Sequence, residues 1–137
     1  MKNRLFGGYQ KACHTEYKYD SVPEHTFSVM LEKDPAILKW LRLAPKQFKI
    51  WYAGGKLYEP DFIVETASAI YMVEVKNPKD NRDEDVKLKA RAAIKYCDHV
   101  NGFAPKPWKY VLLEDTYIKR SSTLEGMVYE ASRFDWV

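Results

Sequence analysis

The feature that most constrains this chain is a pair of apolar segments near its middle that carry carboxylates and a lysine. The first segment, residues 58–65, contains Asp61 directly after a proline, and the second, residues 70–76, contains Glu74 and Lys76. Four small residues separate the two segments, and this spacing predicts a hairpin of antiparallel strands. The flanking residues are too apolar for exposed strands, so the hairpin should lie inside a sheet.

Strand periodicity predicts how these side chains are arranged. Side chains alternate between the two faces of a strand, so Glu74 and Lys76 should point to the same face. Asp61 lies at the start of one strand and Glu74 towards the end of the next, which should bring the two carboxylates close together. The competing interpretation is an ordinary Glu–Lys pair on a solvated strand face, and the apolar neighbours argue against it.

These residue types predict metal-dependent hydrolysis of phosphodiesters. Mg²⁺ prefers oxygen ligands, typically one or two carboxylates with waters and substrate phosphate, so Asp61 and Glu74 are candidate metal ligands and catalytic residues. The backbone carbonyl of Val75 is a further candidate ligand, and Mn²⁺ can substitute at such an oxygen site. Lys76 is the candidate for orienting the attacking water or for offsetting charge on the phosphorane.

Length and charge set the wider frame. A chain of 137 residues predicts one domain. Its 22 basic and 19 acidic residues give a net charge of +3, which permits nucleic-acid binding without establishing it. Lys79 and Lys87 lie in basic stretches that would place positive charge around the proposed site, although each is also explained as a solvated surface lysine.

Other classes of protein find little support in the sequence. No apolar run reaches membrane-spanning length and no signal-peptide pattern is present, so we expect a cytoplasmic protein with no membrane partner. Cys13 and Cys97 do not form a disulfide framework and suit reducing conditions. Together with His14 and His99 they are a conceivable zinc set, but neither pair has zinc-finger spacing.

Periodicity and turn signals predict a mixed sheet with helices on its faces, an α/β fold. The strand after the long helix should lie beside the strand of residues 70–76. We expect an arm (1–20), a core (21–115) and a C-terminal extension with a short helix (116–137). The expected elements are an irregular lead-in over 1–20, helices over 22–33 and 35–43, a strand over 48–52 with a turn at 53–56, strands over 57–65 and 70–76, a helix over 83–101, a strand over 108–113 and a helix over 121–133.

Several motifs follow one another in a specific order along the chain. They are Tyr19-Asp20-Ser21 with Glu24 and Phe27, residues 31–34, Trp40, residues 50–52, residues 58–65, residues 73–76, residues 89–93 and residues 108–113. In this order and spacing, over about residues 10–115, the chain resembles the PD-(D/E)xK nuclease superfamily. Within it, the chain resembles the C-terminal endonuclease domain of the restriction subunits of type III restriction enzymes.

The resemblance implies a restriction-endonuclease-like fold, a central mixed β-sheet flanked by α-helices, and roles for particular residues. Asp61 and Glu74 match the metal-binding acids and Lys76 matches the catalytic lysine. Glu24 lies where many members place a further acid that helps to bind metal, the alternative being a surface helix glutamate near a helix N-terminus. Lys89 lies where related nucleases place a Gln or Lys that contacts phosphate, and Lys87 competes for that role.

The resemblance also implies partners. Double-stranded DNA would be the substrate, with a helicase/ATPase portion and a modification (methyltransferase) subunit as further partners. The chain itself has no Gly-x-x-x-x-Gly-Lys-Ser/Thr motif and therefore no ATP site, so we expect an excised nuclease domain or a small stand-alone nuclease. One alternative is a non-cleaving DNA-binding or subunit-docking module, favoured by aromatic residues in the arm and at 134–136. Another is a structure-specific nuclease of repair or recombination.

Overall fold

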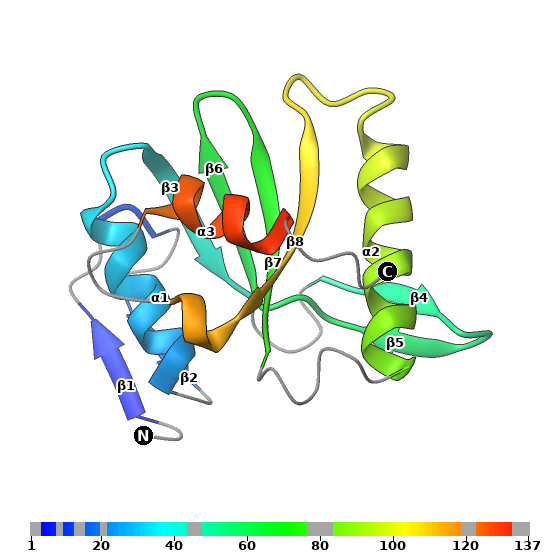
Figure 1. The fold of residues 1–137 in the computed structure, drawn as a ribbon, viewed down its shortest axis with the longest axis horizontal. Helices are drawn as coiled ribbons and strands as arrows, with labels where there is room; N and C mark the ends of the chain where they lie inside the picture. Colours follow the sequence, from blue (N-terminus) through cyan, green and yellow to red (C-terminus); the bar gives the residue numbers. More distant parts are fainter. Residues whose placement is uncertain are drawn as a thin grey trace.

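A computed structural model describes residues 4–7, 10–12, 16–19, 22–43, 48–76, 84–118 and 123–132 (Figure 1). Its strands and helices are interspersed along the chain, with five successive strands between the two longest helices. In chain order they are β1 (Arg4–Gly7), β2 (Glu16–Tyr19), α1 (Val22–Lys33), β3 (Ile37–Arg42), β4 (Ile50–Tyr52), β5 (Lys56–Tyr58), β6 (Phe62–Thr66), β7 (Ile70–Lys76), α2 (Glu84–Val100), β8 (Trp108–Glu114), the short 3₁₀ helix η1 (Asp115–Tyr117) and α3 (Leu124–Ser132).

The main sheet has four strands in the order β3-β6-β7-β8. β6 runs antiparallel to both β3 and β7, which confirms the predicted hairpin. β8 runs parallel to β7 after the chain has passed through α2, as predicted for the strand that follows the long helix. The predicted α/β fold with a mixed sheet flanked by helices is therefore confirmed.

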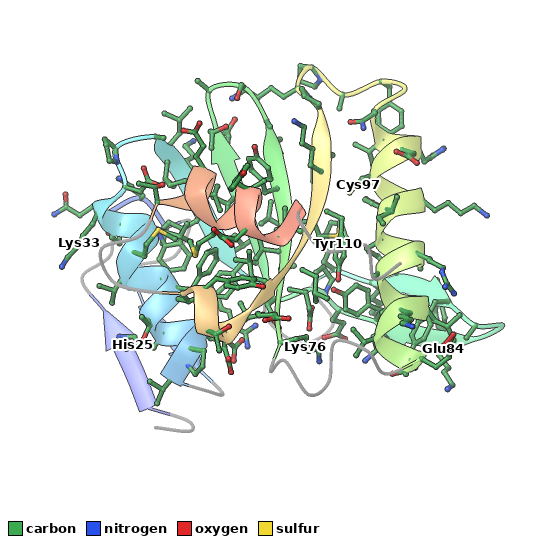
Figure 2. All side chains as sticks on the ribbon, viewed as in Figure 1. His25, Lys33, Lys76, Glu84, Cys97 and Tyr110 are labelled. Atoms are coloured by element: carbon green, nitrogen blue, oxygen red, sulfur yellow. The ribbon has the colours of Figure 1, made fainter. Side chains whose placement is uncertain are left out.

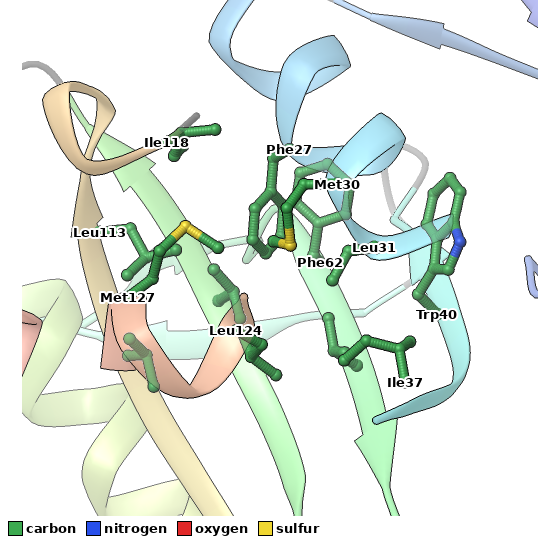
Figure 3. Close-up of a cluster of buried hydrophobic side chains, with 13 residues drawn as sticks. Phe27, Met30, Leu31, Ile37, Trp40, Phe62, Leu113, Ile118, Leu124 and Met127 are labelled. Atoms are coloured by element: carbon green, nitrogen blue, oxygen red, sulfur yellow. The ribbon is translucent and has the colours of Figure 1, made fainter. Parts of the chain in front are cut away.

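Alternating side chains of this sheet pack into two hydrophobic clusters. Figure 1 shows α1 on one side of the sheet, with α2 and the β4–β5 hairpin on the other. The cluster against α1 and α3 (Figure 3) includes Phe27, Met30, Leu31, Ile37, Trp40, Phe62, Val64, Val73, Val111, Leu113, Leu124 and Met127. The cluster against α2 and the hairpin includes Ile50, Tyr58, Met72, Ala93 and Cys97. Neighbouring strand residues thus enter different clusters, as strand alternation requires.

The long helix α2 follows the predicted pattern closely. Its buried residues are Val86, Ala90, Ala93, Cys97 and Val100, which recur every three or four positions and so form one apolar stripe. Acidic residues occupy its first turn, where the helix dipole favours negative charge. The stripe packs α2 onto β8 and β4, which holds the helix beside the end of the sheet that carries the proposed site.

The predicted helix over 35–43 is wrong, because residues Ile37–Arg42 form strand β3 at the edge of the sheet. Ile37 and Trp40 are both buried although they lie three residues apart, a spacing typical of helices. An irregularity in the pairing with β6, between Ile37 and Lys39, shifts the alternation and allows this spacing in a strand.

Two further predictions need correction. The strand predicted over 57–65 is two strands, because β5 pairs with β4 in a separate hairpin while β6 belongs to the main sheet. The arm predicted to be irregular contains the antiparallel pair β1–β2. The turn predicted at 53–56 is confirmed, and it needs its two glycines, because Gly54 and Gly55 have φ values of 74° and 138°.

Candidate metal centre

The pairing of β6 with β7 brings the two predicted acids together. Phe62 pairs with Val73, so one step further out the register places Asp61 beside Glu74. The Val75 N–H donates to Oδ2 of Asp61 at 2.9 Å, which orients this half-buried carboxyl group. The Asp61 carbonyl accepts from the Leu43 N–H at 2.9 Å, so the backbone of this loop is held as well.

Glu74 is the more deeply buried of the two acids, at 6% exposure. Its Oε2 accepts a hydrogen bond from the Tyr58 hydroxyl at 2.6 Å. Its Oε1 lies 3.5 Å from Nζ of Lys76, two residues along the same strand and on the same face. Lys76 stands at the end of β7 (Figure 2) and remains partly exposed, so its ammonium group is accessible to a bound molecule.

Electrostatics set the protonation of the two carboxyl groups. Burial raises the pKa of Asp61 to about 7, and the nearby negative charge of Glu74 adds to this rise. The Val75 N–H and the charges of Arg42 and Lys76 oppose it. Burial also raises the pKa of Glu74, against the opposing effects of Tyr58 and Lys76. Both carboxylates are therefore costly to ionise as they stand, and a bound cation would relieve that cost.

The chemistry of this donor set fits Mg²⁺. Asp61 and Glu74 supply oxygen ligands from adjacent strands, and Mg²⁺ is usually held by one or two carboxylates together with waters and substrate phosphate. In the described ranges, this site included, no three His, Cys, Asp or Glu side chains group so as to hold a metal ion, so the carboxylate ligands offered here are the two of Asp61 and Glu74. Val75 contributes its N–H to Asp61, and the metal-binding role of its carbonyl stays a prediction.

Glu24 occupies a different place from the acid pair. It belongs to α1, which packs on the opposite face of the sheet from α2, and its Oε1 lies 3.0 Å from Nη2 of Arg42. Both side chains of this ion pair are largely buried. In this arrangement Glu24 is the counter-ion of Arg42, and its predicted help in metal binding stays a prediction.

The predicted DNA-binding lysines separate into different positions. Lys89 on α2 lies 3.3 Å from Asp85 and 5.9 Å above the centre of the Tyr58 ring, and its charge lowers the pKa of Glu74. Lys87 lies two residues earlier on the helix and therefore on another side of it. Of the two, the structure brings only Lys89 next to the acid pair. Lys79 lies outside the described residues.

Sequence patterns do not single out two residues that lie near the carboxylates. The pattern around Tyr58 predicts only a strand, yet this residue is buried and bonded to Glu74. The pattern around Arg42 predicts a helix, yet Arg42 is the last residue of β3, pairs with Phe62 and lowers the pKa of Asp61. The position of Tyr58, two residues before Pro60, is the sequence signal for its place near the site, and the sequence holds no such signal for Arg42.

Within the described part of the chain, no helix has both the length and the apolar character needed to cross a membrane. A scan against models of protein families finds none that matches this chain, and a search of curated proteins finds no relative.

Proposed function

We propose that this chain is a metal-dependent endonuclease domain that hydrolyses phosphodiester bonds in DNA. The observation that carries the proposal is the meeting of Asp61 and Glu74 at the end of the β6–β7 hairpin, with Lys76 beside them. Two carboxyl groups with raised pKa values and an adjoining lysine form the kind of perturbed cluster that marks a functional site.

Each residue has a role in this proposal. Asp61 and Glu74 would hold Mg²⁺ or Mn²⁺, and the bound ion would polarise the phosphoryl oxygens and lower the pKa of a bound water. The Val75 N–H keeps Asp61 turned towards Glu74 before any ligand arrives. Lys76 would then orient the attacking water or offset the extra negative charge that the phosphoryl group acquires.

The substrate class follows from the charge near the site. Lys76 and Lys89 place two ammonium groups near the carboxylates, and contacts of this type read the phosphate backbone without reading its sequence. We therefore propose cutting of double-stranded DNA with little sequence preference. A restriction-endonuclease-like fold, a helicase/ATPase portion and a modification subunit of the type III kind belong to the same proposal.

Plasmid nicking tests this function. Supercoiled DNA is incubated with the protein and Mg²⁺ or Mn²⁺, beside Asp61→Asn and Lys76→Met. The matched control is Lys106→Met, because Lys106 is about as exposed as Lys76. Its Nζ lies 2.7 Å from Oε2 of Glu65, and this ion pair does not involve Asp61 or Glu74. We expect metal-dependent nicking that Asp61→Asn abolishes, that Lys76→Met lowers by about 10²-fold or more, and that Lys106→Met retains. Equal nicking by Lys76→Met and the wild type would refute the assigned role of Lys76.

A second candidate function is a DNA-binding or subunit-docking module with no turnover. Trp51 and Leu57 face each other across the β4–β5 hairpin, and both are exposed, Trp51 to 66%. An exposed tryptophan beside a leucine is typical of an interaction surface. Absence of nicking at every metal concentration, with no binding of Mn²⁺ at Asp61, would favour this candidate over the nuclease.

A further inference from the structure

A buried tyrosine outside the main sheet makes a short hydrogen bond to the acid pair. Tyr58 is 3% exposed, and its hydroxyl donates to Oε2 of Glu74 at 2.6 Å, inside the protein. A short hydrogen bond from a neutral hydroxyl to a carboxylate is stronger than one between neutral groups. Because both partners are buried, water does not compete with this bond as it would at the surface.

The Tyr58 ring is held in place from several directions. Tyr58 is the last residue of β5 and pairs with Ile50 of β4, so its backbone belongs to the hairpin and not to the sheet of Glu74. The ring packs in the same hydrophobic cluster as Met72 and residues of α2, and Nζ of Lys89 lies 5.9 Å above its centre. Packing of this kind fixes the position of the hydroxyl oxygen independently of Glu74.

Tyr110 lines the same buried region. It is partly buried against the hydrophobic cluster that contains Tyr58, and it belongs to β8, the strand next to β7. In Figure 2 Tyr110 lies between the sheet and α2. The carboxylate of Glu74 is held through Oε2 by the Tyr58 hydroxyl of β5, while its Oε1 lies 3.5 Å from Nζ of Lys76.

We propose that Tyr58 is a positioning residue that holds the Glu74 carboxylate in the orientation needed to bind the metal ion. The inference rests on the proposed function, because it assigns Glu74 to the metal. With Oε2 tied to Tyr58, rotation of the carboxylate is restricted and Oε1 is the oxygen left towards the open side of the site, where Lys76 is partly exposed. Groups that orient metal ligands in this way typically contribute a factor of about 10–100 to metal affinity.

The test compares two tyrosine-to-phenylalanine variants of the same hairpin. Tyr58→Phe removes the hydroxyl that bonds to Glu74. Tyr52→Phe is the matched control, since the Tyr52 hydroxyl bonds to another carboxylate, Asp85, at 2.8 Å and away from Glu74. Binding of Mn²⁺ is measured by electron paramagnetic resonance, and nicking is measured in parallel. We expect the Kd for Mn²⁺ to rise about 10-fold or more in Tyr58→Phe and less than about 2-fold in Tyr52→Phe.

A double-variant cycle separates positioning from a general effect on structure. In a Glu74→Gln background, Tyr58→Phe should change Mn²⁺ affinity no further, because Tyr58 acts through the Glu74 carboxylate. A loss that persists in that background, or unchanged affinity in Tyr58→Phe alone, would overturn the proposal. If Tyr58→Phe does not fold, Tyr58→Met replaces it, because it also lacks the hydroxyl that bonds to Glu74, with weaker Mn²⁺ binding expected and unchanged binding overturning the inference.

The same measurements distinguish this inference from the proposed function. If the wild-type protein nicks DNA and Tyr58→Phe binds Mn²⁺ normally, the inference about Tyr58 is wrong and the nuclease proposal stands. If the wild-type protein binds Mn²⁺ but does not nick DNA, and Tyr58→Phe binds Mn²⁺ more weakly, the nuclease proposal is wrong and the inference about Tyr58 stands. Wild-type protein that binds no Mn²⁺ would overturn both.

Discussion

Replacing Asp61 with asparagine should make the metal-free protein more stable at pH 8. Burial and the charge of Glu74 raise the pKa of Asp61 from 3.8 to about 7, so the fold holds the proton more tightly than the unfolded chain does. The stability that this proton contributes is complete below pH 3.8 and is lost as the pH rises through about 7. At pH 8 the ionised side chain therefore costs stability, and a neutral isostere removes that cost.

The magnitude follows from the size of the pKa change. A rise from 3.8 to about 7 corresponds to about 4 kcal/mol at a pH above both values. Asparagine recovers only part of this free energy, because its amide is also polar and brings an NH₂ group that needs a hydrogen-bond acceptor. Its remaining oxygen still accepts from the Val75 N–H. We expect a net gain of about 1–2 kcal/mol, or about 3–8 °C in melting temperature for a chain of this size.

The assay is urea denaturation followed by tryptophan fluorescence, with EDTA present, at pH 8 and pH 5. The gain in unfolding free energy from Asp61→Asn should be largest at pH 8 and should shrink at pH 5, where the wild-type carboxyl group is largely protonated in the folded state. Adding Mg²⁺ at pH 8 should raise the stability of the wild type and leave that of the variant nearly unchanged, because a ligand stabilises only the state that binds it.

Asp85→Asn is the control, for which we expect no gain in stability at either pH. The Tyr52 hydroxyl and then Lys89 lower the pKa of Asp85, so its charge favours the folded state and its loss should bring no gain in stability. The reasoning is refuted if Asp61→Asn destabilises the protein by the same amount at both pH values. That result would mean that the Asp61 carboxylate is held by favourable contacts that outweigh its burial and its repulsion by Glu74.

Two other predictions concern the packing around the site. Arg42→Met removes the cation that pairs with the buried Glu24 carboxylate at 3.0 Å, and it should lower the free energy of unfolding by about 3 kcal/mol, with partial recovery when Glu24→Gln is added. Urea titration of both variants measures this, and an additive double variant would contradict the pairing. Met127→Ala on α3 should cost about 2–5 kcal/mol, because Met127 is buried in the main cluster. A cost below about 0.5 kcal/mol would show that α3 adds little to the core.

The part of the site that could be predicted from the sequence is the part fixed by local geometry. The hairpin of β6 and β7 has a short turn, so its register follows from the chain itself and places Asp61 beside Glu74. Strand alternation then puts Lys76 on the face of Glu74. The pattern of α2 was equally local, since one helix turn after another contributes to a single apolar stripe.

The parts that could not be predicted depend on pairing between distant segments. The spacing of Ile37 and Trp40 resembles a helix, and only pairing with β6, with its irregular register, makes this segment a strand. Likewise, Glu59-Pro60-Asp61 interrupts the apolar residues of positions 57–65, but this break alone does not show that β5 leaves the main sheet. The bond between Tyr58 and Glu74 depends on that separation, so it was hidden for the same reason.

The balance of charge around Asp61 and Glu74 links these distant contacts to the chemistry. Tyr58, Lys76 and Lys89 each favour the ionised form of Glu74, and Arg42 and Lys76 do so for Asp61, yet burial outweighs them and both pKa values remain raised. A fold selected for stability alone would do better with an apolar pair at these positions. Retained carboxyl groups that are only partly compensated are instead suited to receive a cation, since the missing charge is then supplied by the ligand. The cost to the metal-free fold and the affinity for the metal thus have the same origin, the buried carboxylates. Asp61→Asn should therefore raise the stability of the metal-free protein and, at the same time, remove the stabilisation by Mg²⁺.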